Sequence, residues 1–372
     1  MQPVIRTLAA VLLTGVLSMP AMPIEAQTNA PAAMPLAFAD LEGWSGERHD
    51  EALEVLLRSC ARAGIGREMA RLCPAAKQAA QGGRAAARAF FEANFRPLRI
   101  TSKDGRAGFL TAYYEPEVDG SLRPGAQFAA PLYALPPGRK AGSTAPYLTR
   151  GEIEAGALAG KGLELVYVRD RIEAFFIHIQ GSARIRLEDG RVLRVGFAGK
   201  NGQPYTSIGK VLVDAGLIDR KEMSAQRLRQ WLHANPGRAD EVMAQNRSFI
   251  FFRRLAVEDP ALGPVGAQGV PLTSGRSLAV DRNFYDFGVP VWLDSVLPEV
   301  DGRPEVFRRL MIAQDTGSAI LGAARGDLFL GSGAAAGNRA GLIQHMADFV
   351  VLWPNEAALP SWAGPLPAAM TR

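Results

Sequence analysis

The stretch Phe307–Gly341, FRRLMIAQDTGSAILGAARGDLFLGSGAAAGNRAG, carries the strongest signals for the fold. An apolar run ends at Asp315, a glycine-containing segment follows, and a second apolar run, DLFLG, begins at Asp327. This pattern is typical of two short strands joined by a turn. The tetrapeptide Asp-Thr-Gly-Ser that begins at Asp315 is also the one that carries the catalytic carboxylate of aspartic proteases, so peptide cleavage is the first function to test.

An aspartic protease needs two carboxylates that share one proton. A single chain must therefore carry a second Asp-Thr-Gly or Asp-Ser-Gly, and this chain carries neither. Asp294-Ser295 continues into Val296, and the Thr-Ser-Gly at 273–275 has no Asp. Aspartic protease is therefore the last of the functions that we consider.

Length and composition indicate a globular protein of two domains with tails. The chain has 372 residues, of which 48% are hydrophobic, and its mean hydropathy is close to zero. The net charge of +5 comes from 42 basic and 37 acidic residues, without a basic run interleaved with aromatic residues. Nucleic acid is therefore not an expected partner.

Residues 1–26 have the features of a secretory signal peptide. One Arg precedes the apolar run LAAVLLTGVL, and Ala21 and Ala26 are candidate cleavage positions. The run has about 10 residues, whereas a bilayer needs about 20, and the prolines at 20 and 23 argue against a buried core helix. This segment has no Cys that could accept a lipid. We expect an exported, periplasmic monomer, with at most loose association with the outer membrane or murein.

The segment from Leu36 to Phe95 has helical periodicity, with apolar residues every three or four positions. It contains the chain's two cysteines, Cys60 and Cys73. Export permits a disulfide between them, and two reduced thiols packed between helices are the alternative.

From Phe109 to Gly199 the pattern is that of strands in an antiparallel meander, which we expect to close into a barrel. Asp189-Gly190 is a strong hairpin signal between two of these strands. His178 alternates within one of them, which favours a structural role. The expected strands are LELVYV, AFFIHIQ, ARIRLE and RVLRVGF.

A helical interlude follows this strand region. Ser207 or Thr206 is placed to cap IGKVLVDAG, Gly216 to end it, and Ser224 to cap a helix that extends through Trp231. FIFFRR, residues 249–254, is then expected as a return strand, and the Gly- and Pro-rich residues 258–276 as a linker. The remaining expected strands are LAVD, VPVWLD, FRRLMIAQD, DLFLG and FVVLWP, before a mobile tail.

Common nucleophile and metal signatures are missing from the sequence. It has no Gly-x-Ser-x-Gly and no His-Glu-x-x-His, and its four histidines have no ligand spacing, so we expect no metal and no cofactor. Carboxylates remain as the candidate catalytic groups. Asp281, Asp315 and Asp327 stand at expected strand ends near glycines, which suits acid catalysis. For each of them alone, hydrogen bonding within a turn is the competing interpretation.

The stretch quoted first, together with SLAVDRNFYDFGVPVWL before it, resembles the three-aspartate domain of the MltA family of lytic murein transglycosylases. The resemblance extends in order from about Phe109 to Trp353. Its further motifs are FLTAYYEPEVDGS, FAAPLYALPPG, LTRGEIEAGAL, FFIHIQGSARIRLEDG, VGFAGKNGQPYTSIGKVLVDAGLI and QNRSFIFFRR.

The resemblance implies a mainly β fold with N-terminal helices, in which a double-psi β-barrel domain is interrupted by an inserted second β-barrel domain, with the glycan in the groove between them. The boundaries that follow are residues 36–113 for the helical first part of the barrel domain, 114–256 for the inserted domain, 257–354 for the three-aspartate part and 355–372 for the tail.

The resemblance also implies the chemistry, namely a lyase that cleaves the β-1,4 bond between N-acetylmuramic acid and N-acetylglucosamine in peptidoglycan and forms 1,6-anhydromuramic acid. Asp327 matches the single catalytic acid and base, Asp315 the supporting aspartate and Asp281 the third aspartate. The motif departs from the family at Ser318 and Leu321. Because no water is consumed, a second catalytic carboxylate is not required.

The same resemblance places further residues along the glycan, although a structural role is equally open for each. A murein hydrolase that admits water and a non-catalytic glycan-binding protein remain the alternative functions. The expected substrate-binding residues besides Asp281 are Thr111, Tyr113, Tyr114, Gln180, Ser182, Lys200, Asn201 and Tyr205.

Overall fold

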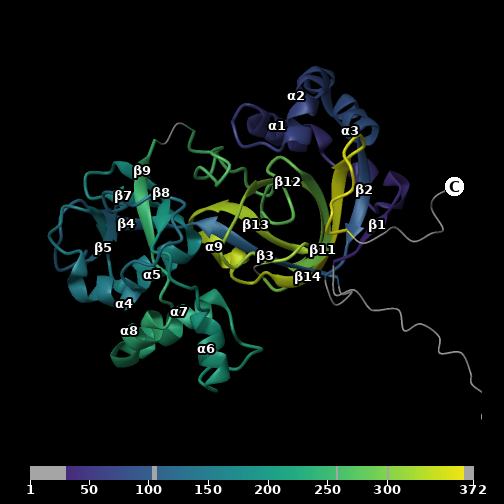
Figure 1. The fold of residues 1–372 in the computed structure, drawn as a ribbon. Coiled ribbons are helices and arrows are strands. Elements are labelled where there is room, and N and C mark those ends of the chain that lie inside the picture. The colour runs from purple at the N-terminus through teal and green to yellow at the C-terminus, as the bar shows by residue number, and fades with distance from the viewer. Residues whose placement is uncertain (1–30, 103–106, 257–258, 300, 364–372) are drawn as a thin grey trace, which may run out of the picture.

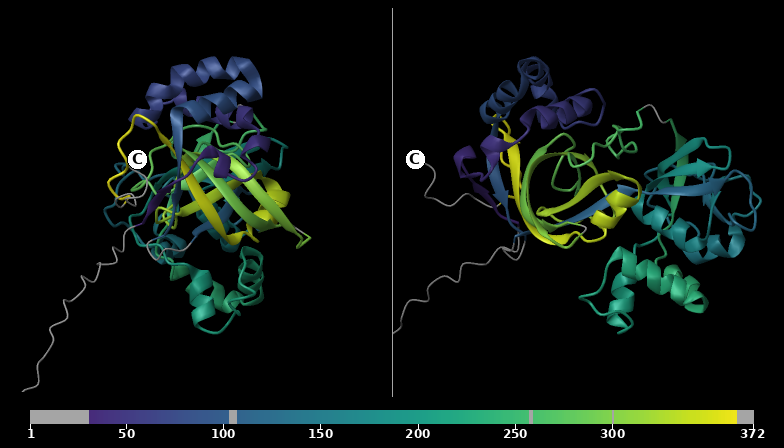
Figure 2. Two further views of the ribbon diagram at one scale, coloured as in Figure 1. Left: turned by 90° about the vertical axis from the view of Figure 1, so that its right-hand side faces the viewer. Right: turned by 180° about the vertical axis from the view of Figure 1, so that it is seen from behind.

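The computed structural model describes residues 31–102, 107–256, 259–299 and 301–363. The expected signal peptide lies outside these residues. The chain forms two β domains side by side, with a helical layer over one of them (Figures 1 and 2).

The first domain is a closed six-stranded barrel. It closes because the last strand, β14, pairs with β11 on one edge and with β3 on the other. Two neighbour pairs, β10–β12 and β13–β3, are parallel, and the others are antiparallel. The strands are β3 (Gly108–Glu115), β10 (Ser277–Val280), β11 (Pro290–Pro298), β12 (Pro304–Asp315), β13 (Arg325–Ser332) and β14 (Gln344–Pro354).

Two strands extend the barrel sheet beside β14, namely β2 (Phe95–Ile100) and, at its edge, β1 (Ala33–Pro35). A short helix, α9 (Gly333–Ala340), follows β13 and contacts β3. All five strands expected from Ser277 onward are confirmed.

An N-terminal helical layer covers one outer face of the barrel, as expected (Figure 1). The ring centroids of Trp44 and Trp292 lie 5.4 Å apart where this layer meets β11. Cys60 and Cys73 form a disulfide between the first two helices, which decides between the two alternatives for these residues. The layer consists of η1 (Phe38–Asp40), η2 (Trp44–Gly46), α1 (His49–Cys60), α2 (Arg67–Ala79), η3 (Ala80–Gly82) and α3 (Gly83–Asn94).

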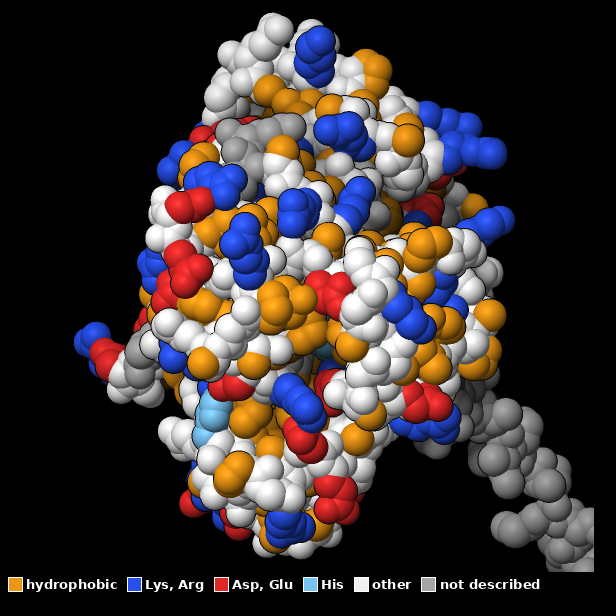
Figure 3. Space-filling model, turned by 90° about the vertical axis from the view of Figure 1, so that its left-hand side faces the viewer, with side chains coloured by type: hydrophobic (Ala, Val, Ile, Leu, Met, Phe, Trp, Pro, Cys, Tyr) orange, Lys and Arg blue, Asp and Glu red, His pale blue; other side chains and the backbone are white. Residues whose placement is uncertain are grey.

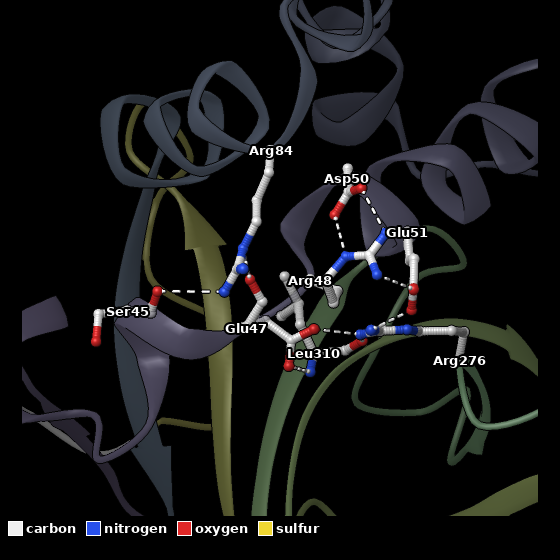
Figure 4. Close-up of polar contacts among 8 residues, drawn as sticks. All are labelled: Ser45, Glu47, Arg48, Asp50, Glu51, Arg84, Arg276 and Leu310. Carbon is white, nitrogen blue, oxygen red and sulfur yellow. Dashed lines mark hydrogen bonds and ion pairs between the residues drawn. The ribbon is translucent and has the colours of Figure 1, made fainter.

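A buried polar network attaches this layer to the barrel (Figure 4). Arg276, just before β10, donates to Glu47 at 2.5 Å and to Glu51 at 2.7 Å. Glu47 also accepts from the backbone N–H of Leu310 on β12, and its carbonyl accepts from Arg84 of α3. Because a buried charge is tolerated only when it is paired, this network fixes where the helices sit.

The second domain is inserted between β3 and β10. Its six-stranded sheet has the order β5-β6-β4-β7-β8-β9, and a bridge between Ala134 and Phe252 brings β5 to β9, so that the two edges of the sheet meet. The expected barrel with an inserted β domain is therefore confirmed. The strands are β4 (Glu117–Ser121), β5 (Ala130–Tyr133), β6 (Glu164–Val168), β7 (Ser182–Leu187), β8 (Val192–Lys200) and β9 (Ile250–Leu255).

Helices pack on this sheet and extend below it (Figure 1). Ser207 and Ser224 cap α6 and α7 as predicted, each by accepting a backbone N–H three residues ahead. Gly190, with φ of 82°, makes the predicted turn between β7 and β8. The helices are α4 (Arg150–Glu152), η4 (Ile153–Ala157), α5 (Arg171–Gln180), α6 (Ile208–Asp214), α7 (Ala225–Ala234) and α8 (Pro236–Ala244).

Two predictions for this domain are wrong, one of a strand and one of the sheet topology. AFFIHIQ is not a strand but the body of α5, because Asp170 accepts from the Glu173 N–H and caps the helix start, while Gly181 ends it with φ of 83°. The run is apolar on every side because the helix packs between two apolar clusters, so its period could not separate helix from strand. In addition, β4 pairs parallel with β7, so the sheet is not a pure antiparallel meander.

The tail also differs from the prediction where it is described. Residues 355–363 pack against the barrel domain: Trp362 lies edge-on to Phe284, at 5.5 Å between ring centroids, and donates to its carbonyl. Buried aromatic area holds this segment in place. Residues 364–372 lie outside the described part of the chain.

Candidate active site

A cavity of about 960 Å³ lies between the barrel and the inserted domain. On the barrel side it is lined by β3, the end of β12 and the start of β13, and by the loop at 264–272, part of the segment expected to be a linker. On the other side it is lined by α5, β7, β8 and β9. Seen from the inserted domain, the surface mixes acidic and basic side chains without one dominant patch (Figure 3).

Asp315 and Asp327 come together in this cavity through the strand register. Ala279 on the central strand β10 pairs with Asp315 on one side and with Asp327 on the other. Asp327 in turn pairs with Thr111 on β3. Paired residues direct their side chains to one face of a sheet. The small side chain of Ala279 between the two carboxylates leaves space for the cavity on that face.

A register shift beside Ala279 makes this row possible. Leu278 pairs with Ala313, but Ala279 pairs with Asp315, so Gln314 is skipped. Without the bulge, Gln314 would oppose Ala279 and Asp315 would face the other side of the sheet. Gln314 instead turns into the core and donates to the Val55 carbonyl and the Ser59 hydroxyl.

Asp327 sits in an environment that favours its neutral form. Burial raises its pKa to about 6, a hydrogen bond from Thr111 and the charge of Arg325 act in the opposite direction, and Asp315 adds a smaller rise. The Thr111 hydroxyl donates to Asp327 Oδ1 at 2.5 Å, and Arg325 donates to the same hydroxyl at 2.7 Å. The carboxyl can therefore carry a proton near neutral pH and release it.

Asp315 is half-buried, and its desolvation raises its pKa, but it is better supplied with donors than Asp327. Tyr113 donates its hydroxyl to Oδ2 at 2.7 Å, and the backbone N–H of Ala267 donates to Oδ1 at 2.9 Å. Burial raises the pKa of Tyr113 well above its ordinary value, so this phenol remains a donor. Two carboxyls in one cavity thus have different surroundings, which is how an acid and a supporting group are distinguished.

The inserted domain contributes four of the predicted residues to the cavity: Gln180, Ser182, Lys200 and Tyr205. Gln180 also spans the groove, because its side-chain oxygen accepts from the backbone N–H of Tyr114 on β3 at 3.1 Å.

Three predicted residues are placed elsewhere. The ring of Tyr114 packs on Gly337 of α9. Asn201 is fully buried, and its side chain donates to the carbonyls of Leu148 and Arg247. Asp281 is buried in a turn and accepts from Asn283 and from the Gly322 N–H. None of these three side chains is among the groups that line the cavity.

Among the cavity-lining residues that were not predicted are two exposed apolar side chains, Phe197 and Ile179, which are 47% and 40% exposed. Phe197 lies beside a β-bulge in β8, where Ala198 is skipped before Gly199 pairs with Phe251, and the bulge changes the direction of the side chain. A glycine two positions after an aromatic residue in a strand is the signal that could have indicated it.

His178 has a structural partner in Arg150, which donates to its Nδ1 at 3.0 Å. Because a guanidinium can only donate, the proton of the neutral imidazole is on Nε2. Burial, followed by the Arg150 charge, holds the pKa of His178 well below its ordinary value. The ring stacks on Phe252 at 5.4 Å, so His178 is a firmly held part of the cavity wall.

A buried ionic cluster stands at the joint between the two domains. Glu115, the last residue of β3, is fully buried and pairs with Arg184 of β7 and Arg194 of β8, each at 2.8 Å. Ser332 of β13 donates to the same carboxylate at 2.7 Å. Both arginines also donate to the carbonyl of Leu262 in the returning chain. The two connections between the domains are thus held by one cluster.

Two parts of the chain match known domains. Residues 109–253 match the MltA specific insert domain, and residues 276–353 match the 3D domain. The chain is 35% identical over 294 residues to membrane-bound lytic murein transglycosylase A of Vibrio cholerae, covering 77% of this chain and 76% of the relative. The chain belongs to the MltA family of lytic murein transglycosylases.

Other members of the MltA family support this conclusion. The Escherichia coli K12 transglycosylase A is 36% identical over 248 residues, which are 65% of each chain. A solved structure of a membrane-bound lytic murein transglycosylase from Agrobacterium tumefaciens has a TM-score of 0.76 at 36% identity and covers 87% of this chain and 98% of that one.

One solved MltA structure contains a sugar. The E. coli MltA with bound chitohexaose has a TM-score of 0.68 at 27% identity and covers 86% of this chain and 90% of that chain. Within the described residues, no group of His, Cys, Asp and Glu could hold a metal ion, and no helix is both long and apolar enough to cross a bilayer.

Proposed function

We propose that this enzyme cleaves the β-1,4 bond between N-acetylmuramic acid and N-acetylglucosamine in peptidoglycan, with Asp327 as the single acid and base. The observation that carries the proposal is a carboxyl whose pKa is raised by burial to about 6, in a cavity between two domains that can admit a glycan strand.

The reaction proceeds in two proton transfers. Protonated Asp327 gives its proton to the glycosidic oxygen, and the bond from that oxygen to C1 of the muramoyl residue breaks. The C6 hydroxyl of the same residue attacks C1, and the Asp327 carboxylate takes the proton of that hydroxyl. The product is a 1,6-anhydro sugar, and Asp327 is protonated again for the next cycle.

Asp315 and the hydroxyl groups around it have a supporting role in this scheme. A carboxylate in the same sheet row as Asp327 stabilises positive charge that develops at C1 in the transition state. Tyr113 and the Ala267 N–H hold Asp315 in place through their hydrogen bonds. Thr111 does the same for Asp327.

In this proposal, other groups of the cavity bind the substrate. Gln180, Ser182 and Lys200 offer polar groups to sugar hydroxyls and acetamides, and Phe197 and Tyr205 offer ring faces. Tyr114, Asn201 and Asp281 act indirectly in this proposal, because they brace the strands and turns from which the cavity is built.

The test is digestion of purified sacculi by the wild type and by Asp327→Asn, followed by mass spectrometry of the sugar ends. We expect anhydro ends from the wild type and at least about 10³-fold slower release from the variant. The matched control is Asp240→Asn, an exposed carboxylate of α8. Reducing ends from the wild type would indicate a hydrolase, and murein binding without release of fragments would indicate a glycan-binding protein.

We further propose that the enzyme is exported to the periplasm, acts as a monomer and associates with a membrane. The first observation in support is the N-terminal segment, which has the features of a signal peptide. The second is that the relatives from V. cholerae and E. coli are named membrane-bound. Fractionation of the producing cell tests the location, because recovery of the chain in the cytoplasm would contradict it.

A further inference from the structure

The two walls of the cavity differ in charge. The wall that belongs to the barrel domain carries both carboxylates, Asp315 and Asp327. Among the described residues, the wall that belongs to the inserted domain has no acidic side chain and three strongly basic ones, Arg150, Lys200 and Arg253. A ligand between the two walls therefore meets carboxylates on one side and cations on the other.

Two of these three cations are free to bind a ligand. Arg150 is already neutralised, because it pairs with Glu154 at 2.9 Å and donates to two backbone carbonyls. Lys200 is half-buried and Arg253 is exposed. In the part of the chain that the structure describes, neither of these two side chains forms an ion pair or donates a hydrogen bond.

The strand register places the two free cations on either side of an aromatic ring. Lys200 lies three positions after the exposed Phe197 on β8. Arg253 on β9 pairs with Gly196, the residue before Phe197. The backbones of the two cations are therefore about 10 Å apart along the strands. A sugar ring that packs on the face of Phe197 has a cation near each of two edges.

These cations do not serve the catalytic carboxyls. The charges that shift the pKa of Asp327 come from Arg325 and Asp315. The pKa of Asp315 is shifted by desolvation and by hydrogen bonds. Neither Lys200 nor Arg253 contributes to either shift. A cation that lines the cavity, has no partner and leaves the acid unaffected is available to an anionic group of the ligand.

The proposed substrate carries such a group on one of its two sugars. N-acetylmuramic acid differs from N-acetylglucosamine only by a lactyl ether at C3. The carboxyl of that ether is free in a stripped strand, and in intact peptidoglycan it is linked to a stem peptide that has carboxylates of its own. A carboxylate attached to the muramoyl residue therefore distinguishes the two sugars. The enzyme has to distinguish them, because it breaks one kind of glycosidic bond and leaves the other.

We propose that Lys200 and Arg253 bind a carboxylate carried by the muramoyl residue and thereby set the register of the strand in the cavity. The inference rests on the proposed function and names the part of the substrate that the inserted domain recognises. Asp315 on the opposite wall repels the same carboxylate. The two walls together direct the muramoyl substituent toward the inserted domain and C1 of that residue toward Asp327.

The test is equilibrium binding of hexasaccharides to the Asp327→Asn enzyme, which leaves the strands uncut. Three strands of alternating N-acetylglucosamine and N-acetylmuramic acid are compared: one with stem peptides, one with free lactyl carboxylates and one whose lactyl groups are neutral methylamides. The two charged strands separate the two sources of the carboxylate. We expect at least one of them to bind about tenfold more tightly than the neutral strand at low salt.

The measured quantity is the ratio of charged to neutral affinity, which does not depend on the fraction of folded protein. Arg253→Gln and Lys200→Gln should each lower this ratio about threefold, and the double variant should bring it close to one. Arg253→Lys keeps the charge and should keep most of the ratio. The matched control is Arg254→Gln, the next residue on β9, which is also exposed, donates to the Leu165 carbonyl and does not line the cavity.

Salt gives a second measurement. The ratio should shrink between about 0.01 M and 1 M salt, because the Debye length falls from about 30 Å to about 3 Å. Four results would overturn the proposal: charged strands that bind no more tightly than the neutral one, a ratio that salt leaves unchanged, a ratio that Arg253→Gln and Lys200→Gln both leave unchanged, and a control that lowers it as much as they do.

Failure of the proposed reaction is seen separately, in the sugar ends that the wild type releases. If Asp327→Asn still cut the strands, the proposed catalytic residue would be wrong. The same ratios would then be measured as KM values, and they would test the carboxylate site as before.

Discussion

Replacing Arg325 by Met should move the alkaline limb of the pH–activity profile to higher pH. Arg325 donates to the Thr111 hydroxyl at 2.7 Å, and that hydroxyl donates to Asp327 at 2.5 Å, so the guanidinium lies no more than about 5 Å from the carboxylate oxygen. Its positive charge lowers the pKa of Asp327, against the larger rise that burial causes. Removing that charge favours the protonated acid.

The size of the effect follows from Coulomb's law. Two unit charges about 5 Å apart interact by about 3 kcal/mol at an effective dielectric constant of 20 and by about 0.8 kcal/mol in bulk water. Since 1.36 kcal/mol corresponds to one pH unit, a rise of about one unit above the wild-type value of about 6 is expected. Near pH 7.5 such a rise leaves about eightfold more Asp327 protonated.

The assay is kcat/KM on a soluble murein fragment as a function of pH. Because the acid must be protonated, activity falls as pH rises through the pKa of the folded enzyme, near pH 6 in the wild type and near pH 7 in Arg325→Met. The position of the limb is the measured quantity, since weaker binding changes only its height. Arg325→Lys keeps the charge and should retain the wild-type limb. A limb that stays in place or moves to lower pH in Arg325→Met would refute the reasoning.

Three further variants test the site, the joint and the disulfide. Asp327→Asn should stabilise the fold at pH 7 by up to about 3 kcal/mol. The pKa of Asp327 is about 6 in the folded protein and about 3.9 in the unfolded chain, so the stability of the wild type falls as pH rises between these values, and that of the variant does not. Melting temperatures should therefore diverge at pH 7 and agree below pH 4, and equal values at pH 7 would contradict the burial argument. Glu115→Gln weakens a buried pair and should lower the free energy of unfolding in urea by about 3 kcal/mol and raise KM for murein more than it lowers kcat. Glu117→Gln, at an exposed position, is its control. If Glu115→Gln leaves both the free energy of unfolding and KM unchanged, the buried cluster does not hold the two domains together. Cys60→Ser and Cys73→Ser should each lower the free energy of unfolding by about 3 kcal/mol, because each opens the loop that the disulfide closes. A reductant should destabilise only the wild type. If it also destabilised either variant, a single disulfide would not explain the result.

Much of the fold was predictable because its signals are local. Caps such as Ser207 and Ser224 satisfy backbone N–H groups within one turn, and Gly190 supplies a positive φ that a tight hairpin needs. Such signals act between residues a few positions apart and can be recognised from the chain alone. Helix α5 was mistaken for a strand because an all-apolar run has no period, although Asp170 and Gly181 at its ends do carry helix signals.

The sequence by itself determined the residue types of the site, the strands that carry them and the family to which they belong. Only the tertiary structure decided which of them meet. A single skipped residue, Gln314, sets Asp315 and Asp327 on one face of the barrel, while Asp281 is turned into a loop. Register and the pairing of distant strands depend on the packing of the whole sheet, and burial, which sets the pKa of Asp327, exists only once both domains are in place.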